Sequence, residues 1–193
     1  WMAWTKAWCH PVVLDRRQTI ASRLTDFAAD NGDLVIIDDD LVDLVGLVDL
    51  VEETDSFLVP QDVAEIVQIV AQVRDAGILA CVAPDMEGPY GELVDALAMI
   101  GVTQEGGQVQ GVRQGYKLMN AIKTVERKLS TRTLRISPSA MMRWAVGNVR
   151  IEATKTAILA SKQNAGDAKI DPVMSLFDAA SVMQLNPEAS RSV

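Results

Sequence analysis

Residues 77–89 read GILACVAPDMEGP, and this stretch decides the fold class. Its apolar run from Ile78 to Ala83 is short enough to be a fully buried strand. An amphipathic helix is predicted before it, over Val63 to Ala76, and a second helix after it, over Tyr90 to Ile100. This helix–strand–loop–helix order predicts an α/β fold with helices layered on a sheet.

The rest of the chain predicts further short elements. Towards the N-terminus we expect a strand over residues 1–8, a helix that opens at Pro11 and ends at Asn31-Gly32, and a strand over Leu34–Ile37. The Leu-Val-Asp run within residues 38–60 fits a helix and a buried strand pair equally well. Towards the C-terminus we expect strands over Gln108–Arg113 and Leu134–Ile136, helices over Tyr116–Leu129, Pro138–Val146 and Ile170–Leu185, and a hairpin of Asn148–Glu152 with Ala157–Ser161.

Composition excludes several classes of protein. The 193 residues are 49% hydrophobic and 23% charged, which is ordinary for a globular domain and argues against disorder. Two cysteines cannot build a disulfide framework or a four-sulfur zinc site, and the single histidine, His10, excludes a His-rich metal site. No Gly-x-x-x-x-Gly-Lys-Ser/Thr phosphate loop is present. The apolar runs are far shorter than a membrane span, and no secretory signal precedes them.

Charge is divided along the chain. Residues 1–105 hold 20 acidic and 5 basic side chains, whereas residues 106–170 hold 12 basic and 3 acidic ones. This asymmetry indicates that one face of the protein meets a polyanion. Solvated helix faces without a partner are the equally weighted alternative.

Two aspartates are the candidates for chemistry. Asp85 follows the buried strand, where α/β folds commonly place ligands, and Asp171 opens the last helix after a basic loop. Carboxylates gathered at such ends are hard oxygen ligands that suit Mg²⁺ or Mn²⁺. Each has a plain alternative: Asp171 before Pro172 fits an N-cap, and Asp85 fits a turn residue. Asp178, seven residues after Asp171 on about the same helix face, fits an exposed position.

Several motifs from Gly77 to Pro187 resemble the C-terminal nuclease domain of the large terminase subunit of tailed bacteriophages. The matching pieces occur in this order: the strand that ends at Asp85, QGYKL with AIKTVERKL (residues 114–129), MRWAVGNV (142–149), AILASKQ (157–163) and KIDPVM (169–174). The segment WCHP (8–11) through Arg16-Arg17 also fits. Together these pieces cover most of the chain.

The resemblance implies a ribonuclease H-like mixed sheet flanked by helices and a two-metal endonuclease that cuts concatemeric double-stranded DNA. Asp85 then matches the family's second acidic position and Asp171 its last, both as metal ligands and catalytic residues for Mg²⁺ or Mn²⁺. The family's first acidic residue lies on a first strand that we expect upstream of Trp1, so the chain is expected to be an N-terminally truncated fragment. Its metal site is then incomplete, and the fragment inactive, unless another acid substitutes. The residues expected to contact DNA phosphates are Lys117, Lys123, Arg127, Lys162 and Lys169.

The expected organisation is one nuclease-like domain over residues 1–187, with a core from residue 77 and a loose tail over 188–193. By resemblance, the partners are double-stranded DNA, the terminase ATPase domain, the small terminase subunit and the portal protein, in the cytoplasm of the infected bacterial host and without a membrane. Two other classes remain open. One is a non-catalytic DNA-binding or portal-docking module, and the other is a different ribonuclease H-like enzyme such as a junction resolvase or transposase.

Overall fold

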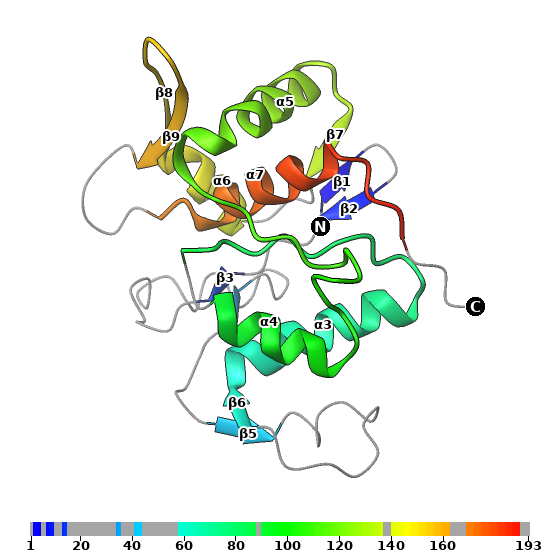
Figure 1. Cartoon of the computed structure of the whole chain (residues 1–193). Coiled ribbons are helices and arrows are strands. Elements are labelled where there is room, and N and C mark those ends of the chain that lie inside the picture. The colour runs from blue at the N-terminus through cyan, green and yellow to red at the C-terminus, as the bar shows by residue number, and fades with distance from the viewer. Residues whose placement is uncertain are drawn as a thin grey trace.

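Two extended segments, 82–86 and 108–112, run parallel at the centre of the structure (Figure 1). The amide of Val82 donates to the carbonyl of Gln108 at 2.7 Å, and the carbonyl of Val82 accepts from Gln110 at 2.9 Å. Val112 continues the ladder, because its amide donates to Pro84 at 2.8 Å and its carbonyl accepts from Met86 at 3.0 Å. Pro84 has no N–H, so the rung that it would donate between these bonds is missing and the pairing is interrupted.

The computed structural model describes residues 2–4, 7–9, 13–14, 34–35, 41–43, 58–87, 90–136, 140–162 and 169–189. Over these residues the fold is mixed α/β. None of the described helices is both long and apolar enough to cross a membrane. The strands are β1 (Met2–Trp4), β2 (Ala7–Cys9), β3 (Val13–Leu14), β4 (Leu34–Val35), β5 (Leu41–Asp43), β6 (Leu58–Pro60), β7 (Leu134–Ile136), β8 (Val149–Ala153) and β9 (Ile158–Lys162). The helices are α3 (Gln61–Asp75), α4 (Tyr90–Met99), η1 (Gly115–Leu118), α5 (Met119–Ser130), α6 (Ala140–Asn148) and α7 (Asp171–Met183).

Helix α4 is the crossover between the two parallel segments, as a parallel pair requires. It packs on α3, and the guanidinium of Arg74 in α3 donates to the carbonyl of Ile100 just after α4. Glycines with positive φ follow both helices: Gly77 at 68° and Gly101 at 75°. Both helices therefore end where the sequence predicts, because glycine tolerates this backbone conformation.

Each face of the parallel pair carries its own hydrophobic cluster. On one face, Val82 and Val109 pack with buried residues of α3 and α4, including Val67 and Leu97. On the other face, Val112 belongs to a cluster with buried residues of α5, α6 and α7. Figure 1 shows the paired segments passing between these two groups of helices. The arrangement is therefore a thin parallel layer with helices on both sides.

The C-terminal predictions are confirmed with small shifts in their limits. Helices α5, α6 and α7 and strand β7 form where the sequence places them, and Met141 and Met142 are buried. The predicted hairpin is also confirmed, since β8 and β9 pair antiparallel over their whole length. The predicted strand at Ile78–Ala83 is wrong in its limits, because Ile78 is 61% exposed and the pairing begins at Val82.

The N-terminal predictions need larger corrections. The single strand predicted over residues 1–8 is instead two strands, since β1 pairs antiparallel with both β2 and β7. The helix predicted from Pro11 is wrong at Val13–Leu14, which form β3 and pair parallel with β4. Of the two structures left open for residues 38–60, strand pairing is found at β5 and β6. The remainder of the helix, Asn31-Gly32 and residues 44–57 lie outside the described residues.

A substitution at Gly111 can test the close packing beside the parallel pair. A Cβ on this residue would lie 2.7 Å from Tyr90 Oη and 2.8 Å from Met86 Cγ. We expect Gly111→Ala to lower the free energy of unfolding by about 1–3 kcal/mol, as overpacking usually does. Urea denaturation measures the change.

The matched control is Gly91→Ala, because the added Cβ would have no heavy atom within 4 Å. Gly91 lies in α4, so its replacement by alanine should leave stability unchanged or raise it by up to ~1 kcal/mol. Equal stability of the two variants would contradict the packing described for Gly111.

Candidate functional site

Asp85 lies at the carboxyl end of the first parallel segment, paired with Val112 of the second. Ligand sites of parallel α/β layers form at such ends. The residue is exposed, and its Oδ1 accepts a hydrogen bond of 2.9 Å from the amide of Glu87. Through this contact Asp85 stabilises a turn, which is the structural alternative considered for it from the sequence. It also fixes the direction of the carboxylate relative to the end of the segment.

Asp178 is the carboxylate that the structure brings to Asp85. It lies in α7 with 5% of its surface exposed, so the exposed position considered from the sequence is wrong. Burial raises the pKa of Asp178 from 3.8 to about 7, and the nearby charge of Asp85 contributes to the rise. The amide of Gln114 opposes this shift, because its Nε2 donates to Asp178 Oδ1 at 3.0 Å.

Gln114 supplies a third oxygen to this region. Its Oε1 is buried and has no hydrogen-bond partner among the described residues, an uncommon state for a buried acceptor. Asp85, Asp178 and Gln114 together offer hard oxygen acceptors, the donor type that Mg²⁺ and Mn²⁺ prefer. In the described part of the chain, no group of three or more His, Cys, Asp or Glu side chains could hold a metal ion.

Asp171 is the first residue of α7 and is exposed. The N-cap of this helix is Ile170, with no side-chain hydrogen bond, so Asp171 does not have the capping role that the sequence allowed. Asp171 precedes Asp178 by seven residues, or about 10 Å along the helix axis. Its pairing with Asp85 in one metal site therefore stays a prediction.

The predicted DNA contacts lie around α5. Lys117 is in η1, Lys123 and Arg127 are one turn apart on α5, and Lys162 ends β9, which packs against η1 and α5. These four side chains are exposed. Lys169, in contrast, is half-buried, and its backbone carbonyl accepts a hydrogen bond from Asn148 Nδ2 at 3.1 Å.

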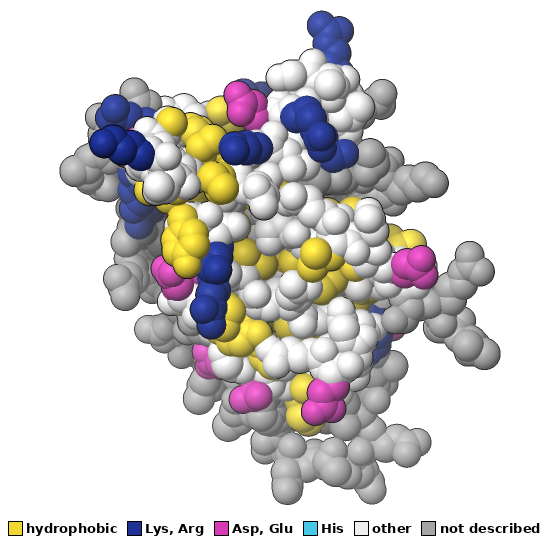
Figure 2. All heavy atoms as spheres, turned by 45° about the horizontal axis from the view of Figure 1, so that its top comes forward, with side chains coloured by type: hydrophobic (Ala, Val, Ile, Leu, Met, Phe, Trp, Pro, Cys, Tyr) yellow, Lys and Arg dark blue, Asp and Glu magenta, His cyan; other side chains and the backbone are white. Residues whose placement is uncertain are grey.

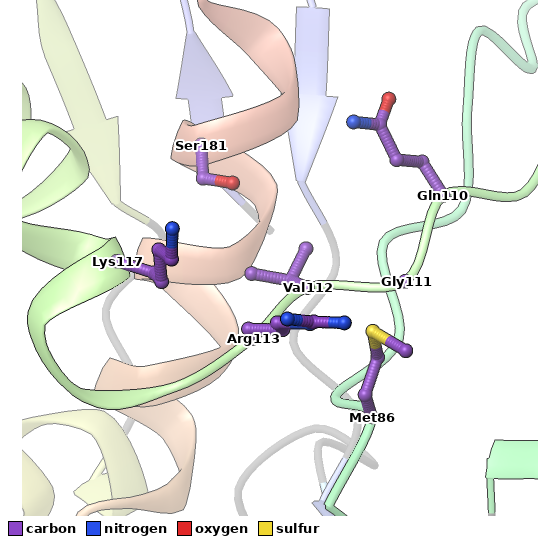
Figure 3. Close-up of a pocket in the computed structure, with 7 residues that line it drawn as sticks. All are labelled: Met86, Gln110, Gly111, Val112, Arg113, Lys117 and Ser181. Atoms are coloured by element: carbon purple, nitrogen blue, oxygen red, sulfur yellow. The ribbon is translucent and has the colours of Figure 1, made fainter.

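An open hollow of about 350 Å³ is lined by residues of both parallel segments, η1 and α7 (Figure 3). Two cationic side chains, Arg113 and Lys117, reach it from the chain that follows the second parallel segment. Its other lining residues are Met86, Gln110, Gly111, Val112 and Ser181.

Sequence reasoning missed Arg113, Gln114 and Asp178. Arg113 directly follows the second parallel segment, and Asp85 lies at the end of the first. Because ligand-binding residues gather at strand ends, this position was the signal that could have identified Arg113. Asp178 stands between buried residues of α7, with Phe177 before it and Ala180 shortly after it. A charged residue inside an apolar helical stripe was the available signal.

Comparisons with known proteins assign neither a family nor a function to this chain. The chain matches no protein-family model, no curated protein and no solved structure. The arrangement of Asp85, Asp178, Gln114 and the neighbouring cations therefore carries the functional argument. Chemically, it places oxygen acceptors near two cationic side chains, Arg113 and Lys117.

The raised pKa of Asp178 predicts how stability depends on pH. A folded pKa of about 7, above the unfolded 3.8, means that the folded state holds the proton more tightly. The contribution of Asp178 to stability is then fully present below pH 4, is lost as pH rises towards 7 and is constant above it. We expect Asp178→Asn to remove this loss and to be more stable than the wild type at pH 8, by an amount on the order of a few kcal/mol.

Urea denaturation from pH 4 to pH 8 measures this difference. The carboxamide introduced by Asp178→Asn retains an Oδ1 acceptor for Gln114, so the hydrogen bond survives the substitution. Asp95→Asn, on the exposed surface of α4, is the control and should follow the wild-type curve. Parallel curves for the wild type and Asp178→Asn would show that Asp178 titrates normally.

Proposed function

We propose that this chain is a divalent-metal-dependent DNA endonuclease domain with a ribonuclease H-like fold, of the kind found in phage terminase large subunits. The observation that carries the proposal is the buried Asp178, hydrogen-bonded to Gln114 two residues beyond the Val112 that pairs with Asp85, at the carboxyl end of a parallel α/β layer. The mixed α/β fold with helices on both faces is compatible with it. The sequence motifs from Gly77 to Pro187 support the same class.

The residues present fit a divalent cation. Asp178 holds a proton near neutral pH chiefly because it is buried, and the charge of Asp85 adds to the rise of its pKa; a bound cation would offset the cost of ionising it. Asp85 and Asp178 would hold the metal, the unpartnered Oε1 of Gln114 offers a further oxygen, and Asp171 joins them by family resemblance. Bound Mg²⁺ or Mn²⁺ would activate water and stabilise the leaving oxygen of a phosphodiester.

The substrate in this proposal is concatemeric double-stranded DNA. Figure 2 shows most Lys and Arg side chains of the visible face in its upper part and most acidic ones in its lower part. A basic surface of this kind binds phosphates without regard to base sequence. The terminase ATPase domain, the small subunit and the portal protein are the partners proposed on the resemblance alone.

A non-catalytic DNA-binding or portal-docking module is the second candidate. One contact favours it: Asp85 Oδ1 already accepts from the amide of Glu87, which is a sufficient structural role for this residue. In that case Asp85 stabilises a turn, and the loss of its charge changes no reaction. Metal binding and cleavage therefore separate the two candidates.

The nuclease proposal predicts that the wild type binds Mn²⁺ and nicks supercoiled plasmid DNA in its presence. Asp85→Asn and Asp178→Asn should each lower the nicking rate more than about hundredfold, since even outer-shell partners of metals matter by 10–100-fold. They should also weaken Mn²⁺ binding measured by calorimetry. Asp95→Asn removes a charge from the exposed surface of α4 and should retain both properties.

Two results would contradict the proposal. The first is nicking by Asp85→Asn at the wild-type rate, which would make the carboxylate dispensable. The second is a wild-type protein that binds no Mn²⁺ at pH 8, where Asp178 is ionised. Thermal unfolding of each variant checks that the fold is retained.

A further inference from the structure

We propose that the hollow lined by Arg113 and Lys117 is a phosphate-binding subsite that holds the backbone of a DNA strand next to the carboxylates. This inference rests on the proposed function and deepens it, because it names the place where the substrate is gripped. The ligand chemistry is a phosphodiester with its sugar. Arg113 was not among the DNA contacts that the sequence predicts.

The backbone brings the two cations to one place. Arg113 and Lys117 are four residues apart, and the chain turns between them at Gly115, whose φ is 70°. Glycine adopts this left-handed conformation without strain, so the turn returns η1 towards the hollow. Both side chains are exposed, and no carboxylate of the described residues forms an ion pair with either. Their charges are therefore available to an anion.

The remaining lining suits a phosphodiester better than a simple ion. In Figure 3, Arg113 extends towards Met86, and Lys117 lies on the side of Ser181. Gln110 and Ser181 can donate hydrogen bonds to phosphate oxygens, while Met86, which is 41% exposed, offers apolar surface to a sugar. A volume of about 350 Å³ lies at the lower end of the range for small-molecule sites.

Residues that line the hollow are neighbours of the carboxylates. Val112 pairs with Asp85, and Gln114, next to Arg113, is hydrogen-bonded to Asp178. Ser181 lies three residues after Asp178 on α7, hence one turn further along the same side of the helix. A strand held in the hollow would therefore bring a neighbouring phosphate towards the exposed Asp85.

The surrounding charge favours a long polyanion over a free nucleotide. Beyond Lys117, the following helix α5 carries two further exposed cations one turn apart, Lys123 and Arg127. Lys117 also lies over the ring of the exposed Tyr116, with its Nζ 5.1 Å from the ring centroid. A row of cations can bind successive phosphates, whereas a mononucleotide would use only the hollow.

The test measures the affinity of the whole chain for a short fluorescein-labelled DNA duplex by anisotropy, in EDTA so that no cleavage enters. Arg113→Gln and Lys117→Gln should each weaken binding about tenfold at low salt, as the loss of a charge-assisted phosphate contact does. Each should also reduce the slope of log K against log[salt] by about 0.9, the value for one phosphate contact. Arg113→Lys should retain most of the affinity.

The matched controls are Arg143→Gln on α6 and Lys155→Gln in the turn between β8 and β9, both exposed. They remove the same charge elsewhere and should change the affinity less than about twofold. An equal loss in all four glutamine variants would overturn the subsite. Competition by a polyglutamate peptide or a deoxynucleoside monophosphate as strong as that by unlabelled duplex would also overturn it.

Metal-free binding separates this inference from the nuclease proposal. If Arg113→Gln weakens DNA binding but the wild-type protein does not nick DNA, the subsite is supported and the nuclease proposal is not. Unchanged affinity together with Asp85-dependent nicking would uphold the nuclease and remove the subsite. Circular dichroism of each variant confirms folding, which these exposed positions should not disturb.

Discussion

The parallel pairing of 82–86 with 108–112 is the contact on which the described structure depends. It is short, and Pro84 deprives it of one rung, so hydrogen bonds alone hold it weakly. Burial compensates, because Val82 and Val109 pack on one side while Val112 packs on the other. If the pairing were lost, the α3–α4 cluster and the α5–α7 cluster would have no common layer.

The same pairing determines the chemistry. Asp85 lies at the end of one segment and Arg113 just beyond the other, so a carboxylate and a guanidinium lie at the same edge of the layer. Helix α7 then adds Asp178 from the face where it is shielded from water. A buried carboxyl close to another one is costly when ionised, and either a proton or a cation offsets that cost. The cost of ionising Asp178 distinguishes this site from an arbitrary cluster of polar side chains.

The parallel pair joins the acidic part of the sequence to the basic part. The segments up to Glu105 are strongly acidic, and those from Gln108 to Lys169 are strongly basic. The parallel pair therefore joins one segment from each part of the sequence.

The sequence by itself determined the elements whose cause is local. Helices α3, α4, α5 and α7 follow from apolar spacing and from Gly77, Gly101 and Pro172 at their ends, and the β8–β9 hairpin follows from its two apolar runs. It also placed Asp85 at a segment end. Only the tertiary structure decided that Asp178 is buried, that Asp171 does not cap its helix and that Arg113 and Lys117 share a hollow. Burial and proximity depend on which elements pack together, and helical periodicity carries no information about a partner that is more than sixty residues away, as Gln114 is from Asp178.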